Sequence, residues 1–298
     1  MAAYRALLVE AFTPEPLQGN GAGVVLLEEP AEASWMQAVA ASLRQSETAF
    51  LWCDPRCDPS EGWRLRWFTP SCEVPLCGHA TLAATLGLHH WGLLEAGAEL
   101  PLATRSGGLP VAVSTGQPPL VSLTLPSGEL MPEPEAPPQL TALLGDTPLA
   151  YWSSALGYRV ALMADGFPLA DLAMDCGALQ GQDRHGLVVM QAAAATTPSL
   201  AGEPCDYQLR FFAPGLGIDE DPVTGSAHAL VAPWWMEHLQ RSTIRGWQPS
   251  WRRGGMLCEA VTPGFVRLSG TGHLLWDGQI HPPVCGHDGE GWAVCSSS

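Results

Sequence analysis

Short apolar runs bounded by glycine, proline or serine make up much of the chain, and they predict a strand-rich protein. The expected strands are YRALLVEAF, GVVLLE, ETAFLW, WRLRWFT, PVAVST, LVSLTLP, YRVALMA, HGLVVMQ, YQLRFFA and GFVRLSG. Three segments show helical patterns instead, with apolar residues three or four positions apart or in longer apolar-rich stretches: 31–45, 78–92 and 225–240. The pattern therefore indicates an α+β protein with few helices.

Two motifs occur twice along the chain, in the same order. The motif RxFxP at 66–70 recurs at 210–214, and the motif ExPxxG at 73–78 recurs at 220–225. The offsets are close to half the chain length, much longer than the period of a solenoid repeat. Two matches in the same order indicate two structurally similar halves.

The densest proline and glutamate segment, at 126–138, is expected to connect these halves. We therefore predict an N-terminal half over 1–128, a C-terminal half over 129–280 and a flexible tail over 281–298. Three side chains of the tail are potential metal ligands: His281, Cys285 and His287. A mobile tail is the preferred interpretation, because this stretch lacks a clear period.

The composition is that of a folded globular protein, with 298 residues, 46% hydrophobic and 15% charged. Its 30 acidic residues outnumber 14 basic ones, and the net charge of −16 disfavours nucleic acid and anionic membranes as partners. There is no lysine, which excludes Schiff-base catalysis, pyridoxal anchoring and the P-loop. No dinucleotide-binding motif is present either, so no cofactor is implied.

The nine cysteines are odd in number and scattered, which favours a reduced, cytoplasmic setting. Arg5 and Glu10 interrupt the first apolar stretch, so we expect no export signal and no membrane span. Cys53 and Cys57 could bind metal or form a disulfide, but no second pair of ligands follows at zinc spacing. We therefore predict no metal site.

The repeated glycines have a chemical consequence at the start of each expected helix. The first N–H groups of a helix lack internal partners, so Gly78 and Gly225 would each open an anion-binding site. If the halves face each other, both sites meet at one cleft, where a substrate carboxylate would bind. His79 and Ser226 follow the glycines and could contribute side chains. For each glycine the alternative is a tight turn with positive φ, and for His79 a buried structural histidine.

Several of these motifs together resemble the PhzF-like isomerases of phenazine biosynthesis and their relatives. The resemblance rests on five segments: VEAFTPEPLQGNGAGVVLL at 9–27, SETAFLW at 46–52, LRWFTPSCEVPLCGHATLAA at 65–84, RFFAPGLGIDEDPVTGSAHALVAPWW at 210–235 and RRGG at 252–255. Gly21 and Gly23 depart from the family, which usually has proline and alanine there. These changes could alter substrate fit without removing a catalytic group.

The resemblance implies a diaminopimelate-epimerase-like fold, in which each half wraps a barrel-like sheet around a central helix and the site lies between them. Racemases of this fold place a cysteine before each helix glycine. Here these positions hold Cys77 and Thr224. A threonine hydroxyl is a poor acid or base near pH 7, so a two-cysteine racemase is disfavoured. Cys77 is expected to pack as a small apolar residue.

The resemblance also implies that Glu47 carries the proton and that Asp221 orients the substrate, with His79 as a further catalytic candidate. Burial would raise the pKa of Glu47 toward neutrality. Matching motif positions add Asn20 and Ser46 to Gly78, Gly225 and Ser226 as expected substrate-binding residues.

The function expected is a cofactor-independent isomerase acting on a small molecule, as a homodimer. Two alternatives remain: a ligand-binding or protein-interaction module with weak activity, and a racemase or dehydratase that uses Cys77 alone. Outside the motifs, Trp67, Tyr158 and Phe211 are candidates for shaping the pocket.

Overall fold

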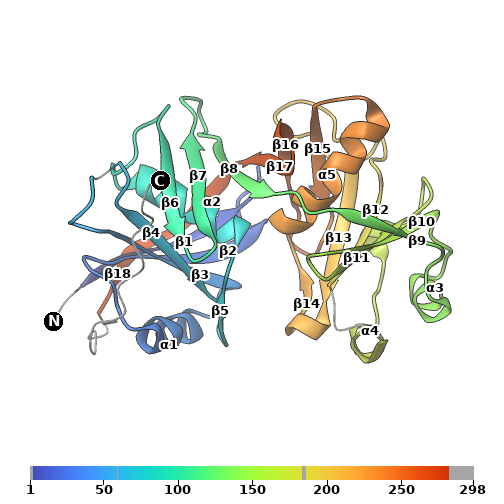
Figure 1. Cartoon of the computed structure of the whole chain (residues 1–298), viewed down its shortest axis with the longest axis horizontal. Coiled ribbons are helices and arrows are strands. Elements are labelled where there is room, and N and C mark those ends of the chain that lie inside the picture. Colours follow the sequence, from blue (N-terminus) through green and yellow to red (C-terminus); the bar gives the residue numbers. More distant parts are fainter. Residues whose placement is uncertain (1–2, 59, 183–185, 282–298) are drawn as a thin grey trace.

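One continuous sheet curls around two central helices, one in each half of the molecule (Figure 1). The structure is a computed structural model, and it describes residues 3–58, 60–182 and 186–281. Each strand expected from the sequence is formed, and the α+β class and the epimerase-like arrangement are confirmed. No helix within these ranges is long and apolar enough to cross a membrane.

The first half forms around helix α2, with α1 on its outer side (Figure 1). Its strands are β1 (Tyr4–Ala11), β2 (Asn20–Leu26), β3 (Glu47–Cys53), β4 (Trp63–Phe68), β5 (Glu73–Val74), β6 (Glu99–Thr104), β7 (Gly107–Val113) and β8 (Val121–Pro126). Its helices are α1 (Ala33–Leu43) and α2 (Gly78–His90).

The second half forms around helix α5, with α3 and α4 at its far end (Figure 1). Its strands are β9 (Leu130–Glu133), β10 (Ala150–Ser154), β11 (Tyr158–Leu162), β12 (Gly186–Ala192), β13 (Tyr207–Ala213), β14 (Ile218–Asp221), β15 (Thr243–Gln248), β16 (Gly254–Thr262) and β17 (Phe265–Gly270). Its helices are α3 (Pro138–Leu144), α4 (Cys176–Gln182) and α5 (Gly225–Leu239), and the last strand of the described residues is β18 (Gly272–Ile280). Short 3-10 turns occupy Leu169–Asp171 and Pro214–Leu216.

The order and direction of strand pairing are the same in the two halves. Strands β2 and β3 pair in parallel, as do β11 and β12, and β4 pairs with β6 as β13 pairs with β15. The halves join where β8 pairs antiparallel with β17, its own counterpart. The duplication inferred from two short motifs therefore extends over the whole sheet.

Each half receives its edge strand from the segment that leaves the other half. After β8 the chain crosses over, and β9 pairs with β10. After β17 it crosses back, and β18 pairs with β1 along its whole length. The expected connector at 126–138 thus contains a strand, and the expected C-terminal half at 129–280 ends in a strand that lies in the first half. The division itself remains a prediction, and the tail from residue 282 lies outside the described residues.

The central helices are buried on all sides, as their composition requires. Every residue of α2 from Gly78 to Leu88 is buried, including Thr81 and Thr85. Both threonine hydroxyls donate to the carbonyl oxygen four residues earlier, which satisfies their polar atoms inside the core. A helix that is apolar on every face needs a surrounding wall, and the curled sheet supplies it.

The repeated motifs form the same ion pair in both halves. Arg66 donates two hydrogen bonds to Glu73, at 2.7 and 2.8 Å, and Arg210 donates two to Glu220, at 2.8 and 2.7 Å. Each pair ties a central strand to the short strand that leads into the central helix. Bidentate pairs of this kind fix geometry as well as energy, so they hold the loops before the two helix N-termini.

The two glycines that open the central helices lie against each other. A Cβ on Gly78 would sit 3.5 Å from the Cα of Gly225, and the reverse also holds. Neither has a positive φ, so close approach of the two helix starts explains these glycines, and a tight turn does not. Both N-termini therefore open at one place between the halves.

Candidate active site

A cavity of about 490 Å³ lies over the junction of the two helix starts. Both halves line it, and its polar and reactive groups include Glu47, Cys77, His79, Tyr158, Asp221 and Ser226. Phe211 also lines the cavity, whereas Trp67 is fully buried away from it.

Glu47 and His79 form the closest charged contact in this cavity. Glu47 begins β3 and His79 is the second residue of α2, and Nε2 of His79 lies 3.0 Å from Oε2 of Glu47. Their side chains are only 17% and 5% exposed. Within the described residues both of these atoms are buried, and each has the other as its charged partner.

The charge state of Glu47 differs from the one predicted from burial alone. Burial raises the pKa of Glu47, but the charge of His79 and polar contacts with His79 and Cys77 lower it by more. The net pKa is below its ordinary value, so the expected rise toward neutrality is wrong. Burial would lower the pKa of His79, yet Cys77 and Glu47 raise it well above its usual range. Within this pair, a charged His79 favours the ionised form of Glu47, and a charged Glu47 favours the protonated form of His79.

Cys77 belongs to the same cluster, although the sequence suggested simple apolar packing. It is the residue before α2, and its Sγ lies 3.5 Å from Nδ1 of His79. Burial and the charge of Glu47 raise its pKa to about 11, so it carries its proton near pH 7. The ligand atoms of Glu47, Cys77 and His79 lie within 4.8 Å of one another, a spacing compatible with a metal ion. The absence of a metal therefore stays a prediction, which elemental analysis would test.

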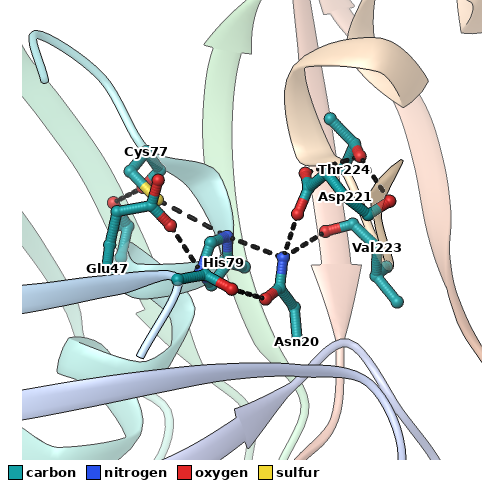
Figure 2. Close-up of polar contacts among 9 residues, drawn as sticks. Asn20, Glu47, Cys77, His79, Asp221, Val223 and Thr224 are labelled. Carbon is teal, nitrogen blue, oxygen red and sulfur yellow. Dashed lines mark hydrogen bonds and ion pairs between the residues drawn. The ribbon is translucent and has the colours of Figure 1, made fainter. Parts of the chain in front are cut away.

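Asn20 links the two halves, since it lies between His79 and Asp221 (Figure 2). Its Nδ2 lies 3.2 Å from Nδ1 of His79 and donates to Oδ1 of Asp221 at 2.6 Å and to the carbonyl of Val223 at 3.1 Å. An amide nitrogen carries two hydrogens, so one of these three contacts is unused at any time. When His79 is protonated at Nδ1, the two bonds go to Asp221 and Val223. Asn20 is fully buried and does not line the cavity, which favours a positioning role over substrate contact.

Asp221, at the end of β14, is held by groups around it. Thr224 donates to its Oδ2 at 2.6 Å, and Gln248 donates to its main-chain oxygen at 2.6 Å and accepts from the N–H of Thr224 at 2.9 Å. Burial and the charge of Glu47 raise the pKa of Asp221 to about 6, against the opposing influence of His79, Thr224 and Asn20. The carboxyl that the sequence assigned to orientation is thus the one with the raised pKa.

On the opposite wall, two hydroxyl groups contact each other. The phenol oxygen of Tyr158 lies 3.1 Å from Oγ of Ser226, the second residue of α5. The ring of Tyr158 packs at 4.7 Å from that of Phe211. Ser46, on the rim, is exposed and donates to Oδ1 of Asn20 at 2.9 Å.

The structure thus brings the expected site residues to one place, with Asn20 behind the cavity and the others along its wall. Sequence reasoning missed Gln248 and the contact of Cys77 with His79. Gln248 follows no motif, and its role depends on β15 lying beside the loop before α5. The cysteine could have been found from its position two residues before His79.

Fold and site together define an epimerase-like protein of two duplicated halves, with a glutamate–histidine pair in the cavity at their junction. The family model described as phenazine biosynthesis-like protein matches residues 9–278. The chain belongs to this family, the PhzF-like isomerases.

Individual relatives agree with this assignment. An uncharacterized isomerase of Halalkalibacterium halodurans is 37% identical over 84% of this chain and 88% of its own. The mouse phenazine biosynthesis-like domain-containing protein 1 is 32% identical over 92% of this chain and 97% of its own. A crystal structure of a PhzF family protein from Enterococcus faecalis superposes with a TM-score of 0.82, at 30% identity, over 94% of this chain and 100% of its own. A probable proline racemase of Agrobacterium radiobacter shares the fold, with a TM-score of 0.62 at 12% identity over 93% of each chain.

Proposed function

We propose that this isomerase moves a proton between two carbons of one small, carboxylate-bearing molecule, with Glu47 as the group that takes and returns it. The observation that carries the proposal is the Glu47–His79 pair, 3.0 Å apart at the wall of the cavity between the halves. Relatives named as isomerases support the reaction class.

The resting state suits removal of a proton from carbon. In its ionised form the Glu47 carboxylate accepts the proton while the C–H electron pair moves into an adjacent unsaturated system. The new Glu47 carboxylic acid then gives the proton to another carbon of the same molecule, and the double bonds shift accordingly. No electrons are gained or lost overall, so this step requires no oxidant or reductant.

The helix N-termini suit a carboxylate. The N-termini of α2 and α5 lie where Gly78 and Gly225 meet, and the partial positive charge of their first N–H groups favours an anion. Negative charge that develops on the substrate during proton removal would be stabilised by the same groups and by His79. Asp221, fixed by Thr224, would orient the substrate on the far side.

A second candidate is a ligand-binding member of the fold with weak activity. The lowered pKa of Glu47 favours it, because a less basic carboxylate is a weaker general base. An enzyme that relies on Cys77 alone is less well supported, because the raised thiol pKa of about 11 keeps the nucleophilic thiolate scarce. A homodimer in the cytoplasm remains an expectation.

The test uses exchange with solvent, which works on a mixture of metabolites as well as on a single substrate. Purified protein is incubated with a small-metabolite extract in D₂O, and mass spectrometry identifies any compound that gains one deuterium. Glu47→Gln keeps the size of the side chain and should slow this gain on the order of 10²–10⁴-fold. Glu28→Gln, which changes an exposed carboxyl of the same half, is the matched control.

Full exchange by Glu47→Gln would refute the assignment of the proton carrier. Saturable binding of a metabolite by the unmodified protein, with neither deuterium gain nor conversion to an isomer, would favour the ligand-binding alternative. Because His79 stabilises the ionised carboxylate, Glu47→Gln is also expected to lower the melting temperature, which burial alone would not predict.

A further inference from the structure

The pairing registers identify the counterpart of Glu47 in the second half. The repeat relates Phe68 to Phe212, and these residues pair with Thr48 on β3 and Leu187 on β12. The residue before Thr48 is Glu47, and the residue before Leu187 is Gly186. The second half therefore has no side chain where the first half has its proton carrier.

On the neighbouring parallel strand the difference between the halves is reversed: the small side chain is in the first half and the large one is in the second half. Glu47 pairs with Ala22 of β2, whereas Gly186 pairs with Tyr158 of β11. In the first half the large polar side chain comes from β3, and in the second half it comes from β11. The missing side chain of Gly186 leaves the room in which aromatic rings lie, since a Cβ there would be 2.3 Å from Phe211 and 3.2 Å from Tyr158.

The partner on the helix is exchanged in the same way. The repeat relates His79 to Ser226, each the second residue of its central helix. The Glu47–His79 contact of 3.0 Å thus corresponds in position to the Tyr158–Ser226 contact of 3.1 Å. One wall of the cavity carries a charged pair and the opposite wall carries a neutral hydroxyl pair.

From this correspondence we infer that Tyr158 is a substrate-binding, specificity-determining residue, which hydrogen-bonds an uncharged oxygen of the substrate on the wall opposite Glu47. Ser226 orients the phenol, and the packing of Tyr158 on Phe211 fixes its ring. This inference rests on the proposed function for the presence of a substrate in the cavity.

The phenol suits a donor role and does not suit the role of a second base. Burial, together with the negative charges of Asp221 and Glu47, raises the pKa of Tyr158, while the contact with Ser226 lowers it less. The hydroxyl therefore keeps its proton near pH 7. A site built to pair with a ligand oxygen rejects analogues that lack it, because its own polar groups then lose their partner.

The test compares ligands that differ by one oxygen. Benzoate and the three hydroxybenzoates present one carboxylate, with or without a hydroxyl, and their binding is measured by titration calorimetry. We expect at least one hydroxybenzoate to bind roughly 3- to 10-fold more tightly than benzoate, the effect of one neutral hydrogen bond. Tyr158→Phe should abolish this preference and leave benzoate affinity within about 2-fold.

Two variants separate this effect from general disruption. Ser226→Ala should reduce the preference, because the phenol loses its orienting partner. Tyr151→Phe removes the hydroxyl of a buried tyrosine in the same half, outside this cavity, and should keep the preference. Failure of every hydroxybenzoate to bind better than benzoate, or a preference that survives Tyr158→Phe, would overturn the inference.

The outcome is independent of the proposed proton transfer. Glu47→Gln should keep the hydroxyl preference, because it acts on the opposite wall, while losing deuterium exchange. A protein that loses exchange in Glu47→Gln but shows no hydroxyl preference would retain the proposed function and refute the role of Tyr158. A hydroxyl preference that depends on Tyr158, together with full exchange by Glu47→Gln, would retain the role of Tyr158 and refute Glu47 as the proton carrier.

Discussion

Substitution of Gly186 by alanine tests the packing on which the asymmetry of the site depends. The added Cβ would lie 2.3 and 2.5 Å from two ring carbons of Phe211, where carbon atoms normally approach to about 3.5–4.0 Å. The buried ring must therefore move by about 1 Å, and overpacking of this kind typically costs about 1–3 kcal/mol. Alanine returns about 0.4–1 kcal/mol by restricting the unfolded chain, so a net loss remains.

We expect the melting temperature of Gly186→Ala to fall by roughly 2–6 °C, measured by differential scanning calorimetry. Gly108→Ala is the control, because Gly108 also lies on a strand, its φ is not positive and a Cβ there meets nothing within 4 Å. In a protein that already carries Phe211→Leu, Gly186→Ala should lower the melting temperature by less, since the smaller leucine side chain leaves room for the added Cβ. A melting temperature for Gly186→Ala equal to that of Gly108→Ala would show that the ring does not occupy this space.

Two further predictions concern charge. Asp221→Asn should stabilise the protein by roughly 1–3 kcal/mol at pH 7.5 and by little at pH 4. A carboxyl whose pKa rises from 3.8 to about 6 on folding binds its proton more tightly in the folded state, so the native protein loses stability as the pH rises between these values. Denaturation of both proteins at several pH values measures this difference. Equal effects of Asp221→Asn at pH 4 and pH 7.5 would contradict the prediction. Arg210→Met should destabilise by about 3–5 kcal/mol, because it leaves Glu220, whose side chain is only 11% exposed, unpaired, whereas Arg253→Met, in an exposed pair 3.7 Å long, should change stability by less than about 0.5 kcal/mol. Urea denaturation distinguishes the two, and similar effects would show that the repeated ion pair does not hold the loop.

The repeat was visible in the sequence because the residues that form the loops before the two central helices lie close together along the chain. Arg66 and Glu73 are seven positions apart and form one hairpin, so their chemistry survives as a motif. The crossover of β18 to the first half was not predictable in this way. Its residues include exposed Leu274, Leu275 and Trp276 in succession, which show no alternation of buried and exposed side chains, and its partner β1 lies at the other end of the chain.

The site shows the same limit. Glu47 and Asp221 were identified from matching motifs, but their pKa shifts depend on which charge lies nearest in space. His79 lies 3.0 Å from Glu47 and reverses the effect of burial there. Tyr158 was one of several candidate pocket residues, and only the pairing of β11 with β12 places it opposite Glu47. Local sequence predicts which residues are chemically able, and the register of distant strands decides which of them meet.

The difference between the two halves bears on the stereochemistry of the proposed reaction. A racemase needs an acid and a base on opposite faces of one carbon, and a duplicated fold can supply one from each half. Here the second half has Thr224 in place of Cys77 and Gly186 in place of Glu47, so it supplies no comparable base at these positions. On the proposed function, the proton that Glu47 removes from one face must return to that same face, at a carbon within reach of the same carboxyl. On the same proposal, the N-termini of α2 and α5 would hold the substrate anion from both halves, and the base would come from the first half alone.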